Sequence, residues 1–352
     1  MKTLKIIILL MIISVNCSFS KETDKVKVVN NASQKKVDVL VDGKLFTSYI
    51  YTDTLPVLKK PVLYPVISAE GITVTRGYPL NPKAGERTDH PHHIGVWFNY
   101  GNVNGFDFWN NSNAIAKEKS DQMGTIVNEE ITKATSGKGK GKLSVKTKWI
   151  TGKNEAVISE KTEFSFYAKP KIRVIERKTT LTALGGDVLF KDDKEGLFGM
   201  RVARELELPS NQPVELLDSH GNKTQVPVLD NTGITGNYLS STGVTGAAVW
   251  GKRADWVALS GKIKNNDVTI VIFDNPGNTG YPSYWHARDY GLFAVNPLGQ
   301  SIFTNGKETL NFKLEAGKSV TFKYGILIYD GKAEKSLIEK EYGSFVKRNS
   351  VK

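Results

Sequence analysis

The sequence predicts an all-β protein: a large antiparallel β-sandwich with a short C-terminal helix. Three observations indicate this fold. Apolar and polar residues alternate with a period of two along much of the chain, short turn sequences interrupt them repeatedly, and only one segment has a convincing helical pattern. Many strands without long helices between them favour antiparallel sheets packed face to face. We expect residues 26–348 to form a single sandwich domain.

The first segment of the chain predicts export. Residues 1–20 have a basic start, an apolar stretch and small residues after it, which is the layout of a signal peptide. Two alternatives remain open: cleavage before Cys17 with lipidation of its thiol, or cleavage after Ser18 or Ser20. Both place the protein in the periplasm or at the cell surface. A lipid anchor at Cys17 would be its only expected membrane attachment.

Alternation is clearest in residues 142–150 and 309–329. The apolar positions of the first segment are Leu143, Val145 and Trp149. The second segment has two runs of apolar residues spaced two apart: Leu310, Phe312 and Leu314, then Val320, Phe322, Tyr324, Ile326 and Ile328. In a strand these side chains point to one face, so each segment predicts strands with one buried and one solvated face.

Turn sequences and one helix complete the expected order of elements. Turns are predicted at residues 41–44, 136–141, 184–187, 264–267 and 315–318, where Gly, Asn and Asp gather. Residues 332–347 predict the helix, with Leu337, Tyr342 and Phe345 as its buried stripe.

Composition narrows the function classes. Cys17 is the only cysteine, which excludes an intramolecular disulfide. The net charge of +12 is compatible with an anionic extracellular polymer, a lipid surface or simply a well-solvated surface. Nucleic acid is not an expected partner of an exported protein. The chain also lacks a nucleotide fingerprint, a phosphate-binding loop and a Ser nucleophile elbow, which argues against nucleotide-dependent chemistry.

Four long irregular segments contain all the histidines of the chain. They are residues 76–113, 192–204, 218–238 and 274–300, and they are rich in Gly, Asn, Pro and aromatic residues. Long loops on a rigid β scaffold commonly carry function. We therefore expect the site to be built from these segments.

The first candidate cluster places three histidines within four positions. In an extended segment, His90 and His92 would share a face and could ligate a divalent metal, with His286 or His220 as a third ligand. The sequence has no recognised ligand motif, so a metal is an open alternative and no cofactor is required. His93 fits a hydrogen-bonded structural role.

The second candidate cluster lies in residues 274–299, where tyrosines and Trp285 surround His286 and Arg288. Aromatic rings beside hydrogen-bonding groups suit a sugar. Packing alone would explain Trp285 and leave His286 and Arg288 unexplained. Four loop acids leave a glycosidase pair open as well: Asp89, Asp107, Glu195 and Asp289.

Four strings of residues resemble a known family. They are RTDHPHHIGVWF (87–98), KEGLFGMRVA (194–203), GKRADWVALSG (251–261) and YPSYWHARDYGLFAVNPLG (281–299). Together they resemble the PmoA-like family of secreted Bacteroidetes proteins over most of residues 40–330. The resemblance implies a sandwich of the galactose-mutarotase supersandwich type and a place among the enzymes of a polysaccharide utilisation pathway.

The resemblance also implies an activity, that of an oligosaccharide dehydratase in the breakdown of ulvan, an anionic algal polysaccharide. Such an enzyme removes water from a non-reducing-end uronate and leaves a 4,5-unsaturated sugar. The reaction needs a base for the proton beside the carboxylate, groups that stabilise the charge developing there, and an acid for the leaving hydroxyl. The anionic oligosaccharide substrate is the expected partner.

The residues of the two clusters can supply these roles. We expect His92 or His286 as base, with Tyr284 or the other histidine as acid. The expected substrate-binding residues are the arginines, for the carboxylate, the tryptophans, for stacking, and one histidine: Arg87, Arg201, Arg288, Trp97, Trp109, Trp285 and His90. A glycoside hydrolase, or a non-catalytic surface glycan-binding lipoprotein, remains the alternative.

Overall fold

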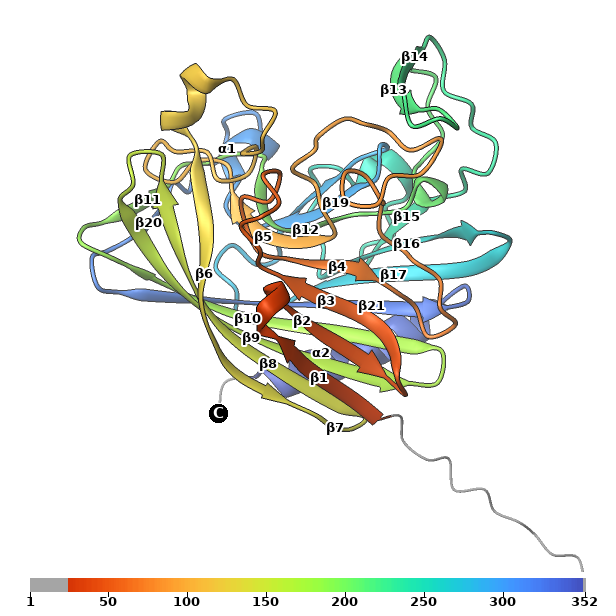
Figure 1. The fold of residues 1–352 in the computed structure, drawn as a ribbon, viewed down its shortest axis with the longest axis horizontal. Coiled ribbons are helices and arrows are strands. Elements are labelled where there is room, and N and C mark those ends of the chain that lie inside the picture. Colours follow the sequence, from red (N-terminus) through yellow and green to blue (C-terminus); the bar gives the residue numbers. More distant parts are fainter. Residues whose placement is uncertain (1–24, 351–352) are drawn as a thin grey trace, which may run out of the picture.

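The computed structural model describes residues 25–350, which form two large antiparallel sheets packed face to face (Figure 1). The expected signal peptide at residues 1–20 and the thiol of Cys17 lie outside the described residues. No helix within residues 25–350 is long and apolar enough to cross a membrane. The predicted all-β antiparallel sandwich with a C-terminal helix is confirmed.

The first sheet has nine strands, and strands distant in sequence are neighbours in it. In spatial order they are β18 (Tyr284–Ala287), β19 (Leu292–Asn296), β12 (Gly196–Arg201), β5 (Val96–Tyr100), β4 (Val62–Val66), β3 (Lys44–Ile50), β2 (Lys36–Val41), β1 (Lys25–Asn31) and β7 (Gly137–Lys138). Three of the segments expected to be irregular contain strands of this sheet, which corrects that expectation: residues 76–113 contain β5, residues 192–204 contain β12, and residues 274–300 contain β18 and β19. These strands are neighbours, because β12 lies between β19 and β5.

The second sheet has eight strands. In order they are β15 (Asn237–Ser240), β16 (Trp256–Ile263), β17 (Asn266–Asp274), β21 (Ser319–Asp330), β10 (Ile172–Ala183), β9 (Ala156–Lys169), β8 (Lys140–Thr151) and β6 (Gly124–Thr135). Two small sheets pair β11 (Val188–Phe190) with β20 (Phe312–Leu314) and β13 (Val214–Leu217) with β14 (Lys223–Val226). The β13–β14 hairpin projects from the body of the molecule (Figure 1).

Helical segments are short apart from the last one. They are η1 (Ala32–Gln34), η2 (Lys117–Gln122), η3 (Arg204–Leu206), η4 (Gly246–Val249), α1 (Gln300–Phe303) and α2 (Lys335–Asn349). Helix α2 packs Ile338 and Phe345 against the outer face of the eight-stranded sheet, beside Trp256 and Phe273. Of the stripe expected from sequence, Phe345 is fully buried, and Leu337 and Tyr342 are partly buried.

The main core lies between the two sheets, where the period-two pattern predicted it. Leu143, Val145 and Trp149 of β8 are buried there, as are the alternate apolar residues of β21. Leu310 is an exception, because it precedes β20 and is exposed. The turns between β2 and β3 and between β16 and β17 use the left-handed backbone that their Asp, Gly and Asn residues favour.

The register of four strands places one row of side chains on the outer face of the nine-stranded sheet. His286 pairs with Ala294, Ala294 with Gly199, and Gly199 with Trp97. Directly paired residues of an antiparallel sheet point to the same side. The adjacent row, which includes Trp285, faces the main core. Between His286 and Trp97, this row consists of Ala294 and Gly199, the two smallest residue types, so little side-chain volume covers the sheet there.

Candidate functional site

Residues 90–93 form a tight turn organised by one buried arginine. The backbone N–H of His93 donates to the carbonyl of His90 at 2.9 Å, and His90 has a φ of 44°. The Arg76 guanidinium donates to the carbonyls of Arg87, Asp89, His90 and His93 at 2.9 to 3.2 Å. The extended course expected for this segment is wrong, because one cation gathers four carbonyls and folds the loop around itself.

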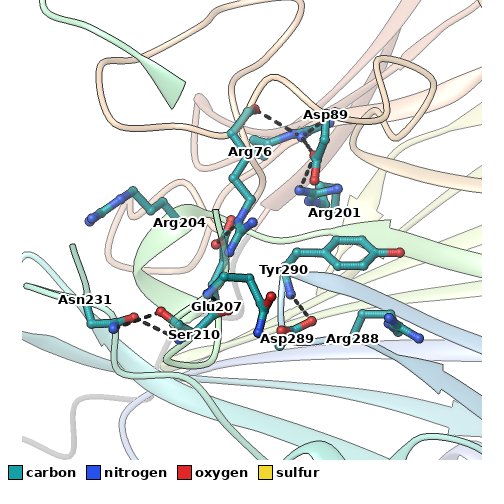
Figure 2. Close-up of polar contacts among 12 residues, drawn as sticks. Arg76, Asp89, Arg201, Arg204, Glu207, Ser210, Asn231, Arg288, Asp289 and Tyr290 are labelled. Carbon is teal, nitrogen blue, oxygen red and sulfur yellow. Dashed lines mark hydrogen bonds and ion pairs between the residues drawn. The ribbon is translucent and has the colours of Figure 1, made fainter. Parts of the chain in front are cut away.

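Asp89 is the anionic centre of this loop. Its Oδ1 lies 2.9 Å from Arg76 Nη1 and 2.6 Å from Arg201 Nη2 (Figure 2). Burial acts to raise the pKa of Asp89, but the Arg201 guanidinium, a hydrogen bond from His90 and the Arg76 guanidinium together hold the pKa well below its usual range. The side chain is therefore a carboxylate at every physiological pH.

This carboxylate orients the imidazole of His90. Asp89 Oδ2 lies 3.3 Å from His90 Nδ1. An ionised carboxylate can only accept, so it favours the tautomer that has its hydrogen on Nδ1 and a free lone pair on Nε2. The ring is held between the parallel rings of His93 and Tyr290, at 4.8 Å and 5.1 Å, and 38% of the side chain is exposed. His90 thus has the geometry of an oriented general base.

The other two histidines of the turn lie deeper. His93 accepts a hydrogen bond from Trp109 Nε1 at 3.1 Å and stacks on Trp97, in the structural role expected for it. His92 is buried, and burial, with the nearby Lys60 ammonium, lowers its pKa to about 2. The His92 ring is therefore neutral and has little access to a substrate.

Lys60 is a site residue that the sequence analysis missed. Its Nζ donates to the His92 carbonyl at 3.0 Å, and burial lowers its pKa to about 7. It lies in a Leu-Lys-Lys-Pro string, residues 58–61, in which nothing about the local sequence indicates a functional lysine. Arg76, in a Thr-Arg-Gly string, also had no signal, because only the fold reveals that its guanidinium faces a loop.

The expected metal at His90 and His92 finds no third ligand in the described part of the chain. Their ring centroids are 5.6 Å apart. Residues 25–350 contain no group of three His, Cys, Asp or Glu side chains arranged to hold a metal ion. His286 and His220, the expected third ligands, do not complete such a group.

His286 is the centre of the second cluster, on β18. Trp250 Nε1 donates to His286 Nδ1 at 3.1 Å, while His286 Nε2 lies 3.7 Å from Glu195 Oε2. Burial, reinforced by Lys194 and Arg288, lowers the pKa of His286 to about 3, so the ring is neutral. Because Nδ1 accepts from Trp250, the hydrogen of the neutral ring is on Nε2. His286 Nε2 is therefore set to donate a hydrogen bond and not to accept one.

Arg288 lies between two aromatic rings and has a free cationic head. Its Cζ is 5.6 Å from the Tyr290 ring and 6.0 Å from the Trp250 ring. No carboxylate within residues 25–350 forms an ion pair with this half-buried side chain. Burial raises the pKa of Tyr290 to about 12, although the Arg201 guanidinium acts to lower it, so the phenol stays protonated and offers Arg288 no negative charge. Because its guanidinium has no ion pair among the described residues, Arg288 can bind an external anion.

The two clusters meet at Tyr290. Its ring stacks on His90 from the first loop. The same ring contacts Arg201 and Arg288 (Figure 2). His90 is also among the groups that lower the pKa of His286. The structure thus brings together, on the outer face of the nine-stranded sheet, five of the residues singled out by sequence: His90, Glu195, His286, Arg288 and Tyr290.

Several expected substrate contacts are corrected by burial. Trp97, Trp109 and Trp285 have no exposed surface and present no face to a sugar ring. Each is an interior residue because its strand or loop packs it beneath the polar layer. Trp250, which the sequence analysis missed, is the partly exposed tryptophan beside His286.

Two of the expected arginines and the expected acid Tyr284 are also engaged elsewhere. Arg87 is buried with its Nε 2.7 Å from Glu207 Oε2, and the guanidinium of Arg201 is bound to Asp89. Tyr284 is buried and donates to Glu308 at 3.3 Å. These three side chains stabilise the scaffold of the site, so they are not available to a substrate.

Three of the four expected glycosidase acids have other partners. Asp107 accepts the backbone N–H groups of Trp109 and Asn110, and Asp289 accepts the backbone N–H of Tyr290. Asp89 is neutralised by two arginines. Glu195, beside His286, is the one of the four that faces the cluster.

The chain resembles several solved structures at low identity. A galactose mutarotase-like protein from Clostridium acetobutylicum has 13% identity and a TM-score of 0.39, with 88% of this chain and 100% of that chain covered. A galactose mutarotase related enzyme from Lactobacillus acidophilus has 10% identity and a TM-score of 0.28, with 88% and 99% covered.

The third is a GH36 α-galactosidase from Geobacillus stearothermophilus, with 12% identity and a TM-score of 0.37. It covers 86% of this chain, and the match spans 41% of that longer chain. No residue role is transferred from any of these structures. A comparison with curated proteins finds no match.

A family model described as a family of unknown function, DUF6807, matches residues 36–343. The match extends from β2 into α2 and includes both clusters of the site. The chain belongs to the DUF6807 family.

Proposed function

We propose that the protein is a carbohydrate-active lyase, a dehydratase that removes water from the non-reducing-end uronate of an anionic, ulvan-type oligosaccharide. The observation that carries this proposal is the unpaired Arg288 cation beside two oppositely oriented imidazoles, His90 and His286. An elimination next to a carboxylate needs one anion-binding group, one base and one acid. The resemblance of the loop motifs to the PmoA-like family supports the same reaction.

We assign a side chain to each step. Arg288 binds the uronate carboxylate and stabilises the negative charge that develops on it. His90 Nε2 takes the proton from C5, with Asp89 stabilising the imidazolium through Nδ1. The C5 electron pair forms the C4–C5 double bond. The hydroxyl on C4 leaves as water with the proton that His90 took from C5, while the Nε2–H of His286 donates a hydrogen bond to the departing oxygen.

This assignment differs from a hydrolase by its carboxylates. Glycoside hydrolysis ordinarily uses two carboxyl groups on either side of the bond. Here Glu195 lies beside His286 and Asp89 is neutralised by two arginines, whereas histidines and an arginine supply the other functional groups. A lyase therefore explains more of the site than a hydrolase does.

The test is the appearance of the ultraviolet absorbance of an unsaturated uronate when the purified protein acts on uronate-ended ulvan oligosaccharides. Arg288→Gln and His90→Gln should each lower kcat/KM by about 10²-fold or more, because each removes an anion-binding or proton-transfer group. Arg253→Gln is the matched control. Arg253 has a cation–π contact with Tyr284 of β18, the strand that also carries His286. Arg253 itself lies near Glu308 and outside the cluster.

Three outcomes contradict the proposal. New reducing ends without unsaturation would indicate a hydrolase. Binding of the oligosaccharide without any change of its mass would indicate a glycan-binding protein. Full activity of the Arg288→Gln variant would show that the carboxylate is bound elsewhere.

A further inference from the structure

A second polar site lies on the opposite side of the sandwich, on the outer face of the eight-stranded sheet. Residues on β8 and β9 alternate between the main core and this face, so Lys140, Lys142, Ser165 and Tyr167 point outward while Leu143 points inward. Direct register joins Lys140 to Tyr167 and Lys142 to Ser165. Helix α2 covers only the neighbouring part of the face.

The end of α2 and this open part of the sheet enclose a cavity of about 260 Å³. Its lining includes four cations, two carboxylates, two further polar groups and one aromatic ring: Lys140, Lys142, Lys178, Arg348, Glu163, Glu176, Ser165, Asn349 and Tyr167. The lining has no aliphatic side chain. The volume of the cavity is slightly below that of typical small-molecule pockets, which begin at about 300 Å³. This volume suits one sugar ring with its charged substituent.

The charges of the cavity are incompletely paired. Arg348 binds Glu176 at 2.6 Å, and Lys178 lies 3.7 Å from Glu163. Neither Lys140 nor Lys142 forms an ion pair with any carboxylate in residues 25–350. Two lysines on one strand, two positions apart, thus leave a local excess of positive charge.

The cations are also held in place before any ligand arrives. Lys140 Nζ lies 4.7 Å and Arg348 Cζ 4.8 Å from the centre of the Tyr167 ring. Cation–π contacts restrict the rotamers of these long side chains. A preorganised cation loses less conformational entropy on binding an anion than a free surface lysine does.

We propose that this cavity is a second binding site, for the sulfate- or carboxylate-bearing sugars of an anionic polysaccharide. The unpaired lysines recognise the anionic substituent, and Ser165 and Asn349 offer hydrogen bonds to hydroxyl groups. A membrane surface fits less well, because the lining provides no aliphatic side chain for insertion. The site holds a polymer on the outer face of the eight-stranded sheet. The reacting end of the polymer then reaches the outer face of the nine-stranded sheet, either of the same molecule or of another one.

The test measures binding of the purified full chain to immobilised ulvan, dextran sulfate, polygalacturonate and neutral dextran. The Lys140→Gln/Lys142→Gln variant should bind ulvan about tenfold more weakly, and the loss should shrink as salt rises. Dextran sulfate and polygalacturonate show whether sulfate or carboxylate is recognised. Lys117→Gln/Lys119→Gln, which changes the charge equally on exposed η2, is the matched control.

Binding of ulvan by Arg288→Gln should persist, and turnover of short oligosaccharides by Lys140→Gln/Lys142→Gln should be unchanged. This separates the second site from the proposed reaction, since binding is read out without catalysis. Equal losses in the lysine variant and its control, or unchanged binding in both, would overturn the proposal. So would binding to anionic phosphatidylserine vesicles in preference to all three anionic polymers.

Discussion

At the scale of single residues, the site depends on buried charges whose partners are distant in sequence. Asp89 is held by Arg76 and Arg201, and its second oxygen orients His90. His286 is oriented by Trp250, with the opposite tautomer. Two chemically identical imidazoles thus become an acceptor and a donor through their neighbours. The charge of Lys60 has no ion pair within residues 25–350, and the attraction of Asp107 does not offset the effect of burial, which makes the charge costly.

Replacing Lys60 by Met should stabilise the protein below neutral pH. The pKa of Lys60 is lowered to about 7, so below pH 7 the folded state holds a buried ammonium at a cost that the unfolded state does not have. Between pH 7 and roughly 10, the folded lysine is neutral while the unfolded one is still protonated, and stability rises with pH. The gain from Lys60→Met should therefore be largest near pH 6 and fade toward pH 10.

Urea denaturation at several pH values measures this gain. Lys59→Met, at the adjacent position in the same loop, is the control, and its effect should not depend on pH in the same way. A gain for Lys60→Met that is equal at pH 6 and pH 9.5 would show that the amine is not buried as a neutral group.

At the scale of elements, the turn between β18 and β19 positions the anion-binding part of the site. Arg288, Asp289, Tyr290 and Gly291 form this turn, in which the N–H of Gly291 donates to the carbonyl of Arg288 and the N–H of Arg288 donates to that of Leu292. Gly291 has a φ of 84°, which glycine adopts at little cost. The turn is also tightly packed beneath, so its shape is fixed.

Gly291→Ala should lower both stability and activity. The added Cβ would lie 3.2 Å from Glu207 Cγ and from Val202 Cγ2, in addition to the unfavourable φ. We expect a loss of about 1–2 kcal/mol in unfolding free energy and a larger KM, because Arg288 and Tyr290 would shift. Gly317→Ala, in the turn before β21, has a similar φ of 72° and open space around it. It should show the backbone cost alone, with no change in KM.

At the scale of the whole molecule, the sandwich separates the proposed catalytic face from the proposed polymer-binding face and joins them through a mostly apolar core. One buried ion pair interrupts this core: Arg177 Nη2 lies 2.6 Å from Glu160 Oε1. The Arg177 guanidinium lies 4.6 Å from the Phe98 ring of the other sheet and 5.1 Å from Phe164. This pair therefore contacts both sheets at once.

Breaking the pair on one side should cost more than removing it. Arg177→Met alone leaves Glu160 buried without its counter-ion, and we expect a loss of about 3–5 kcal/mol in unfolding free energy. The double variant with Glu160→Gln keeps polar contacts to Trp149 and Thr162 without the charge and should recover part of that loss. Chemical denaturation of the single and double variants gives the coupling energy. A double variant as unstable as the sum of both singles would contradict this account.

Local chemistry made much of the fold predictable from sequence. The strands at 142–150 and 319–330 follow from alternation, because a sandwich buries one face of each strand, and the turn at 41–44 follows from residues that tolerate positive φ. The concentration of His, Arg and aromatic residues in two loops also indicated where the site lies. The tight turn at His90 was not predictable, since Arg76 stabilises it from outside the segment.

The sequence by itself determined the class of fold, several of its strands and turns, and the segments that carry the candidate site, because these depend on local periodicity and composition. Only the tertiary structure decided which candidate residues are available. Strand order placed β12 between β5 and β19, buried Trp97, and paired Arg201 with Asp89 while it left Arg288 free. Such outcomes depend on contacts between segments about a hundred or more residues apart, and no local pattern encodes them.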